Sequence, residues 1–120
     1  MANVFIDSNI LFDITERDIT RIKMLNKHDV SISALSFHII FYTYKYKIPN
    51  EKLNQYYKQF HIISMTDNIL RNSMIGPTSD LEDNIQLHSA VKKDSDYFLT
   101  SDKKLLKMKF FGRTKIVSTL

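Results

Sequence analysis

Three aspartates stand at positions from which their side chains could act together. Asp7 directly follows the apolar residues 4–6, and Asp102 lies just beyond residues 97–100; both segments are predicted to be strands. Asp83 falls in the first turn of a predicted helix. In a parallel sheet covered by helices, the carboxyl ends of the strands and the amino ends of the following helices share one edge. We therefore expect the three carboxylates to converge there.

Carboxylates that lie close together repel one another, and their pKa values rise unless a cation neutralises them. A hard divalent cation with oxygen ligands suits such a group, which points to Mg²⁺ or Mn²⁺. A cation of this kind lowers the pKa of a water ligand and neutralises the charge that develops on a phosphodiester. The chemistry that the three aspartates permit is metal-dependent hydrolysis of a phosphodiester bond.

Each aspartate also has a purely structural interpretation. Asp7 and Asp102 could each cap the helix that follows, and Asp83 could favour the positive amino end of its own helix. Caps of this kind are common for single aspartates. The occurrence of three such positions at one expected edge is what favours a metal site.

Short apolar runs alternate with helical patterns along the chain. We predict strands at residues 3–6, 30–33, 61–65, 96–100 and 116–117. Strands that alternate with helices imply βα units and a mostly parallel sheet covered by helices. The length of 120 residues leaves room for one core. The sequence therefore predicts an α/β fold with four to five strands in a single domain over residues 1–120.

Two of the predicted helices bear on the site. One covers residues 34–46 and has an apolar stripe at helical spacing, made of Leu35, Ile39, Tyr42 and Tyr46. The other follows Gly76-Pro77, contains Asp83 and runs to about residue 93. Ser79 and Glu82 have the spacing of a capping box for this helix, and Asp80 is assigned to its N-cap or to the periphery of the site.

The composition excludes several classes of protein. The chain has no Cys, which excludes disulfide scaffolds, thiol catalysis and Cys-based zinc sites. No apolar run approaches the roughly 20 residues that a membrane span needs, so no membrane partner is expected. The amino terminus lacks the basic and apolar regions of a signal peptide. We therefore expect a cytoplasmic protein.

Basic residues gather towards the end of a chain whose formal net charge is +4. Eight of them lie between residues 92 and 115: Lys92, Lys93, Lys103, Lys104, Lys107, Lys109, Arg113 and Lys115. Lysines also interleave with Phe and Tyr at residues 41–47. Basic side chains among aromatic rings suit single-stranded nucleic acid, whose phosphates meet the lysines and whose bases stack on the rings. A solvated lysine face beside core aromatics is the alternative for each segment.

Other residue types offer little support for chemistry. The four histidines show no ligand spacing, and His38, beside the apolar stripe, is predicted to be a hydrogen-bonded structural residue. No serine has the flanking glycines of a nucleophile elbow. Glycine occurs only at positions 76 and 112, which excludes a glycine-rich phosphate-binding loop.

Several segments of the chain resemble the PIN-domain family. Residues 4–9 read Val-Phe-Ile-Asp-Ser-Asn, which is similar to the opening motif of an apolar strand followed by Asp-Ser/Thr-Asn. Residues 33–36 sit where the family has its second strand and the next helix. Residues 80–86 read Asp-Leu-Glu-Asp-Asn-Ile-Gln, similar to the Asp-Phe-Glu-Asp-Ala-Leu-Gln segment of a bacterial, VapC-like branch. Residues 100–102 complete the Thr-x-Asp motif.

The resemblance implies a three-layer α/β/α fold and a divalent-metal-dependent endoribonuclease. Carried over by motif, it assigns Asp7, Asp83 and Asp102 to a catalytic site that binds Mg²⁺ or Mn²⁺. Asn9 or Ser8 would assist Asp7 by hydrogen bonding, and Thr100 would support Asp102. Many bacterial members are toxins of toxin–antitoxin pairs, often dimeric. RNA, a small antitoxin and a second copy of the chain are therefore the expected partners.

The chain departs from the family at the second acidic position. A Glu is usual on the helix after the second strand, but residues 36–40 read Ser-Phe-His-Ile-Ile, with Ile39 nearest the expected place. Three carboxylates remain, and His38 could contribute from a neighbouring position. The alternative function is a catalytically impaired module of this fold that binds RNA or protein. A flavodoxin-like or receiver-type domain is a third possibility, although its acid pair is not evident.

Overall fold

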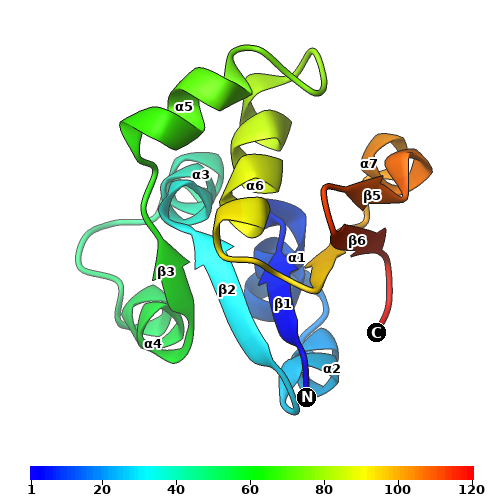
Figure 1. Ribbon diagram of the computed structural model, residues 1–120. Coiled ribbons are helices and arrows are strands. Elements are labelled where there is room, and N and C mark those ends of the chain that lie inside the picture. Colours follow the sequence, from blue (N-terminus) through cyan, green and yellow to red (C-terminus); the bar gives the residue numbers. More distant parts are fainter.

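The computed structural model describes residues 1–120 and has one six-stranded sheet (Figure 1). Its strands are β1 (Asn3–Ile6), β2 (Asp29–Ser33), β3 (His61–Ile63), β4 (Tyr97–Leu99), β5 (Phe110–Phe111) and β6 (Thr114–Val117). Their order is β3-β2-β1-β4-β6-β5, and every neighbouring pair is parallel except β5 and β6. The mostly parallel α/β sheet is confirmed, whereas the expected four to five strands are too few.

The additional strand, β5, forms an antiparallel hairpin with β6. Phe111 pairs with Thr114 across a two-residue turn, and Gly112 at its first position has a φ of 59°. Such tight hairpin turns need positive φ, which glycine adopts without strain. A two-residue strand between Lys109 and this turn is too short to give an alternating pattern, so periodicity did not reveal it.

Eight helical segments connect and cover the strands (Figure 1). They are α1 (Ser8–Phe12), the π-helix η1 (Asp13–Arg17), α2 (Arg21–Leu25), α3 (Ala34–Tyr44), α4 (Glu51–Gln59), α5 (Asp67–Ser73), α6 (Leu81–Lys92) and α7 (Lys103–Met108). In most of them, a polar side chain just before the helix accepts a hydrogen bond from a backbone N–H of the first turn. These N-cap residues are Asp7, Ser33, Asn50, Thr66, Asp80 and Asp102. None of the helices combines the length and the apolar character that crossing a bilayer requires.

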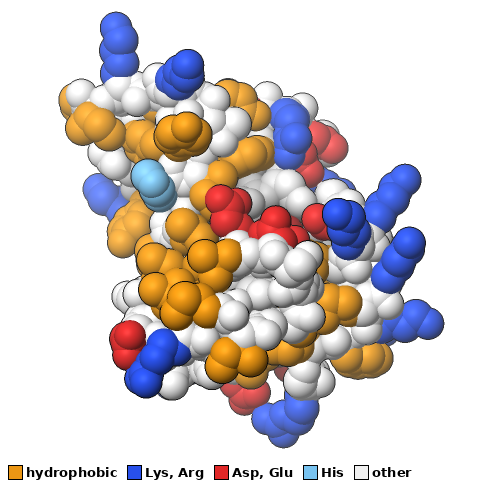
Figure 2. All heavy atoms as spheres, turned by 90° about the horizontal axis from the view of Figure 1, so that it is seen from above, with side chains coloured by type: hydrophobic (Ala, Val, Ile, Leu, Met, Phe, Trp, Pro, Cys, Tyr) orange, Lys and Arg blue, Asp and Glu red, His pale blue; other side chains and the backbone are white.

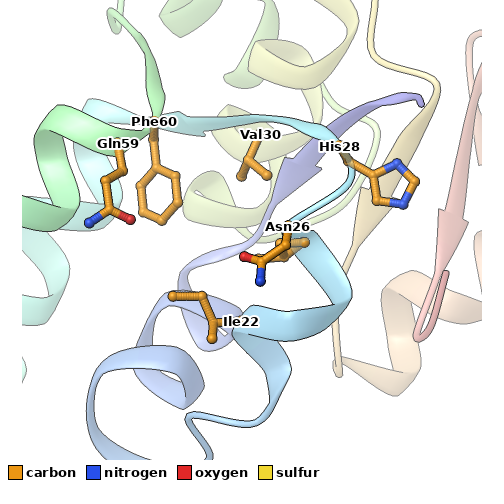
Figure 3. A pocket seen from close by; sticks show the side chains of 7 residues that line it. Ile22, Asn26, His28, Val30, Gln59 and Phe60 are labelled. Atoms are coloured by element: carbon orange, nitrogen blue, oxygen red, sulfur yellow. The ribbon is translucent and has the colours of Figure 1, made fainter.

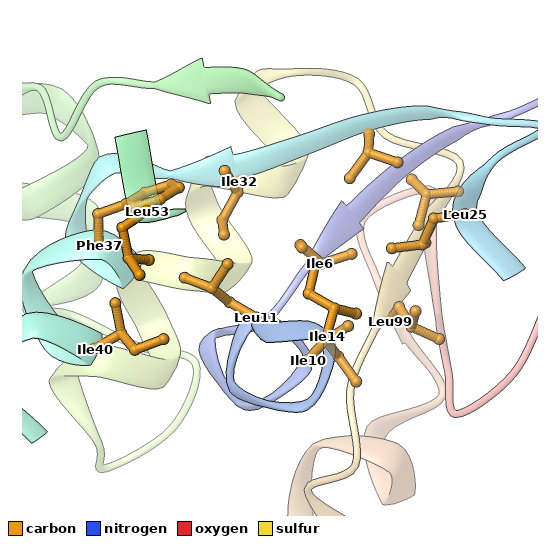
Figure 4. Close-up of a cluster of buried hydrophobic side chains, with 12 residues drawn as sticks. Ile6, Ile10, Leu11, Ile14, Leu25, Ile32, Phe37, Ile40, Leu53 and Leu99 are labelled. Carbon is orange, nitrogen blue, oxygen red and sulfur yellow. The ribbon is translucent and has the colours of Figure 1, made fainter. Parts of the chain in front are cut away.

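The core consists of two apolar clusters on opposite faces of the sheet. Val4 and Ile6 of β1 belong to the larger cluster, which α1 to α4 cover (Figure 4). Phe5, between them in sequence, belongs to the smaller cluster with residues of α6 and α7. Successive side chains of a strand point to opposite faces, so a central strand buried on both sides reads as a continuous apolar run. This arrangement is the expected three-layer α/β/α architecture.

The order of the strands places a topological switch at the middle of the sheet. From β1 the chain adds β2 and β3 on one side and then crosses to add β4 and β6 on the other. In open α/β sheets, ligands bind beyond the carboxyl ends of the strands at such a switch. Here the switch lies between β1 and β4, the strands that precede Asp7 and Thr100.

Asn84 fixes the loop that leads into α6. Its side-chain amide donates to the carbonyl oxygens of Ser73 and Thr78 at 2.8 and 2.9 Å, and its Oδ1 accepts from the Thr78 N–H and hydroxyl at 2.9 and 2.6 Å. Asn84 is 3% exposed, so water cannot replace these bonds. The residue therefore sets where the amino end of α6 lies.

We predict that Asn84→Ala lowers the free energy of unfolding by about 2–4 kcal/mol, because buried donors and acceptors lose their partners. Urea unfolding monitored by circular dichroism measures this change. The control is Asn72→Ala, which removes an exposed amide in the last turn of α5. This variant should change the free energy of unfolding by less than about 0.5 kcal/mol. Equal midpoints for both variants would contradict the role given to Asn84.

Candidate metal and catalytic site

The carboxylate of Asp7 is buried at the carboxyl end of β1. Its Oδ1 accepts a hydrogen bond from the Ser8 backbone N–H at 2.8 Å, and its Oδ2 accepts one from the Thr100 hydroxyl at 2.8 Å. The Asn9 amide adds a longer contact of 3.4 Å to Oδ2. Asp7 therefore caps α1, as the structural interpretation expected, and also lies at the switch point of the sheet.

Thr100 connects Asp7 to Asp102. Its hydroxyl donates to Asp7, while its oxygen accepts the Asp102 backbone N–H at 3.0 Å. Oδ1 of Asp102 in turn accepts the backbone N–H groups of Lys104 and Leu105 at 2.8 and 3.3 Å, which caps α7. One threonine thus fixes the relative position of two carboxylates that are 95 residues apart in the sequence.

Asp83 lies half-buried in the first turn of α6. Its backbone N–H donates to Oδ1 of Asp80 at 2.9 Å, so Asp80 is the N-cap of this helix. The assignment of Asp80 to the N-cap is therefore confirmed, and the predicted capping box of Ser79 and Glu82 is wrong. The hydroxyl oxygen of Thr78 accepts a hydrogen bond from the Asp80 backbone N–H at 3.1 Å. This bond forms a turn before the helix, so that Asp80 rather than Ser79 stands at the N-cap. Glu82 takes no part in the cap.

A hollow of about 360 Å³ lies between the amino ends of α6 and α7. Asp80, Asp83 and Asp102 line it, together with Lys104 and residues of the loop before α6. Figure 2 looks onto this edge of the sheet and shows acidic side chains gathered near its middle. Lys and Arg side chains lie on one side of them, and a large apolar area lies on the other.

Burial and mutual repulsion act on two of these carboxylates. Loss of hydration raises the pKa of Asp7 to about 6, although the hydrogen bonds from Thr100 and Ser8 act in the opposite direction. Loss of hydration also raises the pKa of Asp83 to about 6, and the negative charges of Asp80, Asp7 and Asp102 add to the effect. In the structure, Asp83 and Asp102 line the same hollow, and Asp7 is linked to Asp102 through Thr100.

The donor set suits a hard divalent cation. It consists of carboxylate oxygens, and none of the five ion pairs in the structure neutralises an acid of this hollow. As the side chains lie, no three acidic or histidine groups are close enough to enclose a cation by themselves. Mg²⁺ commonly binds one or two protein carboxylates and keeps several waters, so direct enclosure is not required.

The face of α3 that carries Ile39 has no acid. Ile39 lines a second groove, of about 490 Å³, whose other walls are Leu35, His38, Tyr42, Thr43 and Glu82. Leu35, Ile39 and Tyr42 of the predicted apolar stripe therefore face the groove, whereas Tyr46 lies beyond the end of α3. The residues buried beneath α3 are Ser36, Phe37 and Ile40. Because α3 is apolar on nearly every side, periodicity did not identify which side is covered.

The aromatic segment at residues 41–47 is only partly exposed. Tyr44 stacks on Tyr46, and the Tyr46 hydroxyl donates to Glu16, so these rings contribute to packing. Tyr42 is 79% exposed and stacks on no other ring. His38 is exposed as well, which corrects the prediction of a hydrogen-bonded structural histidine.

A smaller hollow of about 170 Å³ lies at the opposite edge of the sheet, near the start of β2 (Figure 3). Ile22, Val30 and Phe60 line it, but no acidic residue does. His28, at its rim, accepts the Ala2 backbone N–H at 3.2 Å and so holds the amino terminus. His28 is the only titratable side chain that lines this hollow, and its contact with the amino terminus gives it a structural role.

The fold is shared with chains of solved toxin–antitoxin complexes. A complex titled VapBC2 from Rickettsia felis, bound to a DNA fragment from its promoter, contains a chain with 14% identity and a TM-score of 0.69. The match covers 96% of this chain and 97% of that chain. A toxin–antitoxin complex from Klebsiella pneumoniae gives 18% identity and a TM-score of 0.74, covering 92% of this chain and 94% of that chain. The expected PIN-like fold is thereby confirmed.

Comparisons of sequence found no match, in contrast to the comparison of structures. No protein-family model and no curated protein matches this chain. The motif branch suggested by residues 80–86 therefore rests on the resemblance alone. What the solved structures establish is the arrangement of strands and helices.

We predict that Asp83→Asn stabilises the protein at pH 7.5 in EDTA. The pKa of Asp83 is higher in the folded state than in the unfolded chain, so the free energy of unfolding falls as the pH rises from about 4 to about 6. The loss of stability persists above pH 6, because Asp83 is then charged in the folded state. The neutral amide side chain of the Asp83→Asn variant carries no such charge and restores the lost stability. For a half-exposed group, a gain of about 3 °C in Tm is expected.

Thermal unfolding followed by circular dichroism measures this gain, which should disappear at pH 4 because the native Asp83 is then protonated as well. Asp67→Asn is the control, since Asp67 is exposed and paired with Arg71 at 2.9 Å. A variant that is less stable than the native protein at pH 7.5 would contradict the repulsion inferred for Asp83.

Proposed function

We propose that this protein is a divalent-metal-dependent endoribonuclease and the toxin of a toxin–antitoxin pair. The observation that carries the proposal is that Asp83 and Asp102 line one hollow, with Asp7 linked to Asp102 through Thr100 at the switch point of the sheet. None of the three forms an ion pair with a basic side chain. The fold shared with chains of toxin–antitoxin complexes supports it. The resemblance to PIN domains supplies RNA as the substrate.

The three aspartates would hold Mg²⁺ or Mn²⁺, which when bound acidifies water and neutralises charge on the scissile phosphate. The chain itself orients the carboxylates before substrate arrives. Thr100 and the Ser8 N–H fix both oxygens of Asp7, and the first turn of α7 fixes Oδ1 of Asp102. Such preorganisation reduces the rearrangement needed to reach the transition state.

The lysines of α7 would hold the RNA backbone. Lys103, Lys104 and Lys107 lie on the helix that Asp102 caps, and Lys104 lines the acidic hollow itself. None of them forms an ion pair with a carboxylate. Their charges remain available to phosphates, whose binding releases counterions and gives affinity without sequence preference.

A small antitoxin is the protein partner that we propose, with a second copy of the chain as a further partner. The complexes from Rickettsia felis and Klebsiella pneumoniae support this proposal, and this chain matches more than nine-tenths of the chain compared in each. An antitoxin would serve to restrain the nuclease until it is needed. Neither partner contributes to the three-aspartate site in this account.

The second candidate function is an RNA- or protein-binding module with an impaired site. The observation that favours it is Ile39, which lies in an apolar groove where the family usually has an acid. Such a module would retain RNA in EDTA and would turn over no substrate. The two candidates therefore differ in a measurable way.

We predict that the native protein cleaves labelled single-stranded RNA in Mn²⁺ or Mg²⁺ and that EDTA stops the cleavage. Asp83→Asn should reduce the rate at least 100-fold while leaving the fold intact, because it removes one of three charged oxygen donors. Rates come from time courses on denaturing gels, with proteins purified in parallel. Asp67→Asn, a surface change distant from the hollow, should cleave at the native rate.

The outcomes separate the candidates. Retention of RNA by a folded native protein that never cleaves it would favour the binding module. Equal cleavage by the native protein and Asp83→Asn would remove Asp83 from the site and would point to a contaminating nuclease.

A further inference from the structure

The groove along α3 lies directly beside the acidic hollow. Glu82 lines the groove, and its neighbour Asp83 lines the hollow, so the first turn of α6 forms a wall of both. The groove measures about 490 Å³, which is ample for one nucleobase. Whatever occupies the groove would lie next to the hollow in which Lys104 and the proposed cation would bind a phosphate.

The two walls of the groove are fixed relative to each other. The side-chain amide of Gln86 on α6 donates to the hydroxyl of Ser36 on α3 at 3.0 Å, and both side chains are fully buried. Ser33 caps α3 through the Leu35 N–H at 3.1 Å. The groove is therefore formed in the protein alone and needs no partner to create it.

Tyr42 forms an aromatic wall of the groove, and its ring stacks on no other ring of the protein. Its ring is 79% exposed, whereas the neighbouring rings of Phe41, Tyr44 and Tyr46 pack against one another. Leu35 and Ile39 extend the apolar surface beside it. A flat, exposed ring next to a phosphate site is the feature on which unpaired bases stack.

Glu82 supplies a hydrogen-bond acceptor to the same groove. Because Asp80 caps α6, Glu82 is not held by the cap, and it is exposed with no basic partner. A carboxylate is an acceptor only, so it favours a base edge with donors. The Watson–Crick edge of guanine offers two adjacent N–H donors, whereas that of uracil offers one.

We propose that this groove is a base-recognition subsite that binds one unpaired guanine next to the scissile phosphate. Tyr42 stacks on the base, and Glu82 accepts hydrogen bonds from its Watson–Crick edge. The inference rests on the proposed ribonuclease function and adds a sequence preference to it. A base fits better than a protein segment because Glu82 lines the groove and the adjacent Asp83 lines the acidic hollow. Lys104, which has no acidic partner, lines that hollow as well and can bind the phosphate next to the base.

The first test measures affinity without cleavage. Fluorescein-labelled RNA hexamers of uridine, with or without one central guanine, are titrated with the protein in EDTA and followed by anisotropy. The guanine hexamer should bind several-fold more tightly than the uridine hexamer. Tyr42→Ala should weaken its binding about 5- to 20-fold, whereas Tyr42→Phe should keep most of the affinity because it keeps the ring.

The matched control is Tyr57→Ala, which removes a 48%-exposed ring on α4, outside the groove. It should bind both hexamers like the native protein. Glu82→Gln should bind the uridine hexamer normally and lose the preference for guanine. Circular dichroism of every variant checks that the fold is retained.

The second test maps cleavage of a mixed-sequence RNA in Mn²⁺ by sequencing the product ends. Native cleavage should concentrate beside guanine, and Glu82→Gln should cleave without that preference. If Tyr42→Ala and Glu82→Gln bind and cleave like the native protein, the subsite is overturned while the nuclease stands. Loss of all cleavage in Glu82→Gln would also overturn it, since Glu82 would then act on the reaction itself.

The two tests separate this inference from the nuclease. A guanine preference that depends on Tyr42 and Glu82, in a protein that never cleaves, would support the subsite and overturn the nuclease. Absence of binding to every RNA would overturn both.

Discussion

A carboxylate buried at the end of the central strand is the constraint on which the site depends. Asp7 is 3% exposed, and burying a charge costs free energy unless other groups compensate. The protein supplies hydrogen bonds from Thr100 and the Ser8 N–H but no positive charge, so the pKa of Asp7 stays near 6. A costly group kept in this state is typical of a site shaped for chemistry rather than for stability.

The fold brings further acidic residues, and no basic partner, to the edge of the sheet where Asp7 lies. The switch in strand order brings β4 beside β1, and the Thr100 hydroxyl then ties Asp102 to Asp7. The loop held by Asn84 brings the amino end of α6, with Asp83, to the same edge. The lysines of α7 lie next to the acids without pairing with them. A bound cation would neutralise the carboxylates, and a polyanion would neutralise the lysines of α7.

The sequence predicted the features that depend on short-range patterns. The buried runs before Asp7 and Asp102 marked the central strands, because strands covered on both faces must be apolar throughout. The errors arose where long-range packing decides. Nothing in residues 34–46 shows which side of this largely apolar helix is covered, so the sequence did not reveal that Leu35, Ile39 and Tyr42 line a groove while Phe37 and Ile40 are buried. The cap moved from Ser79 to Asp80 because of a hydrogen bond to Thr78, and the hairpin at Gly112 is too short to leave a pattern.

The central claim is that these aspartates together bind a divalent cation. Calorimetric titration of Mn²⁺ into the native protein, Asp102→Asn and the surface variant Asp67→Asn tests it without relying on catalysis. We predict saturable binding to the native protein and to Asp67→Asn. Binding to Asp102→Asn should be at least tenfold weaker, since Asp102 is one of the carboxylates that line the hollow. Equal binding by all three proteins, or no binding to any, would contradict it.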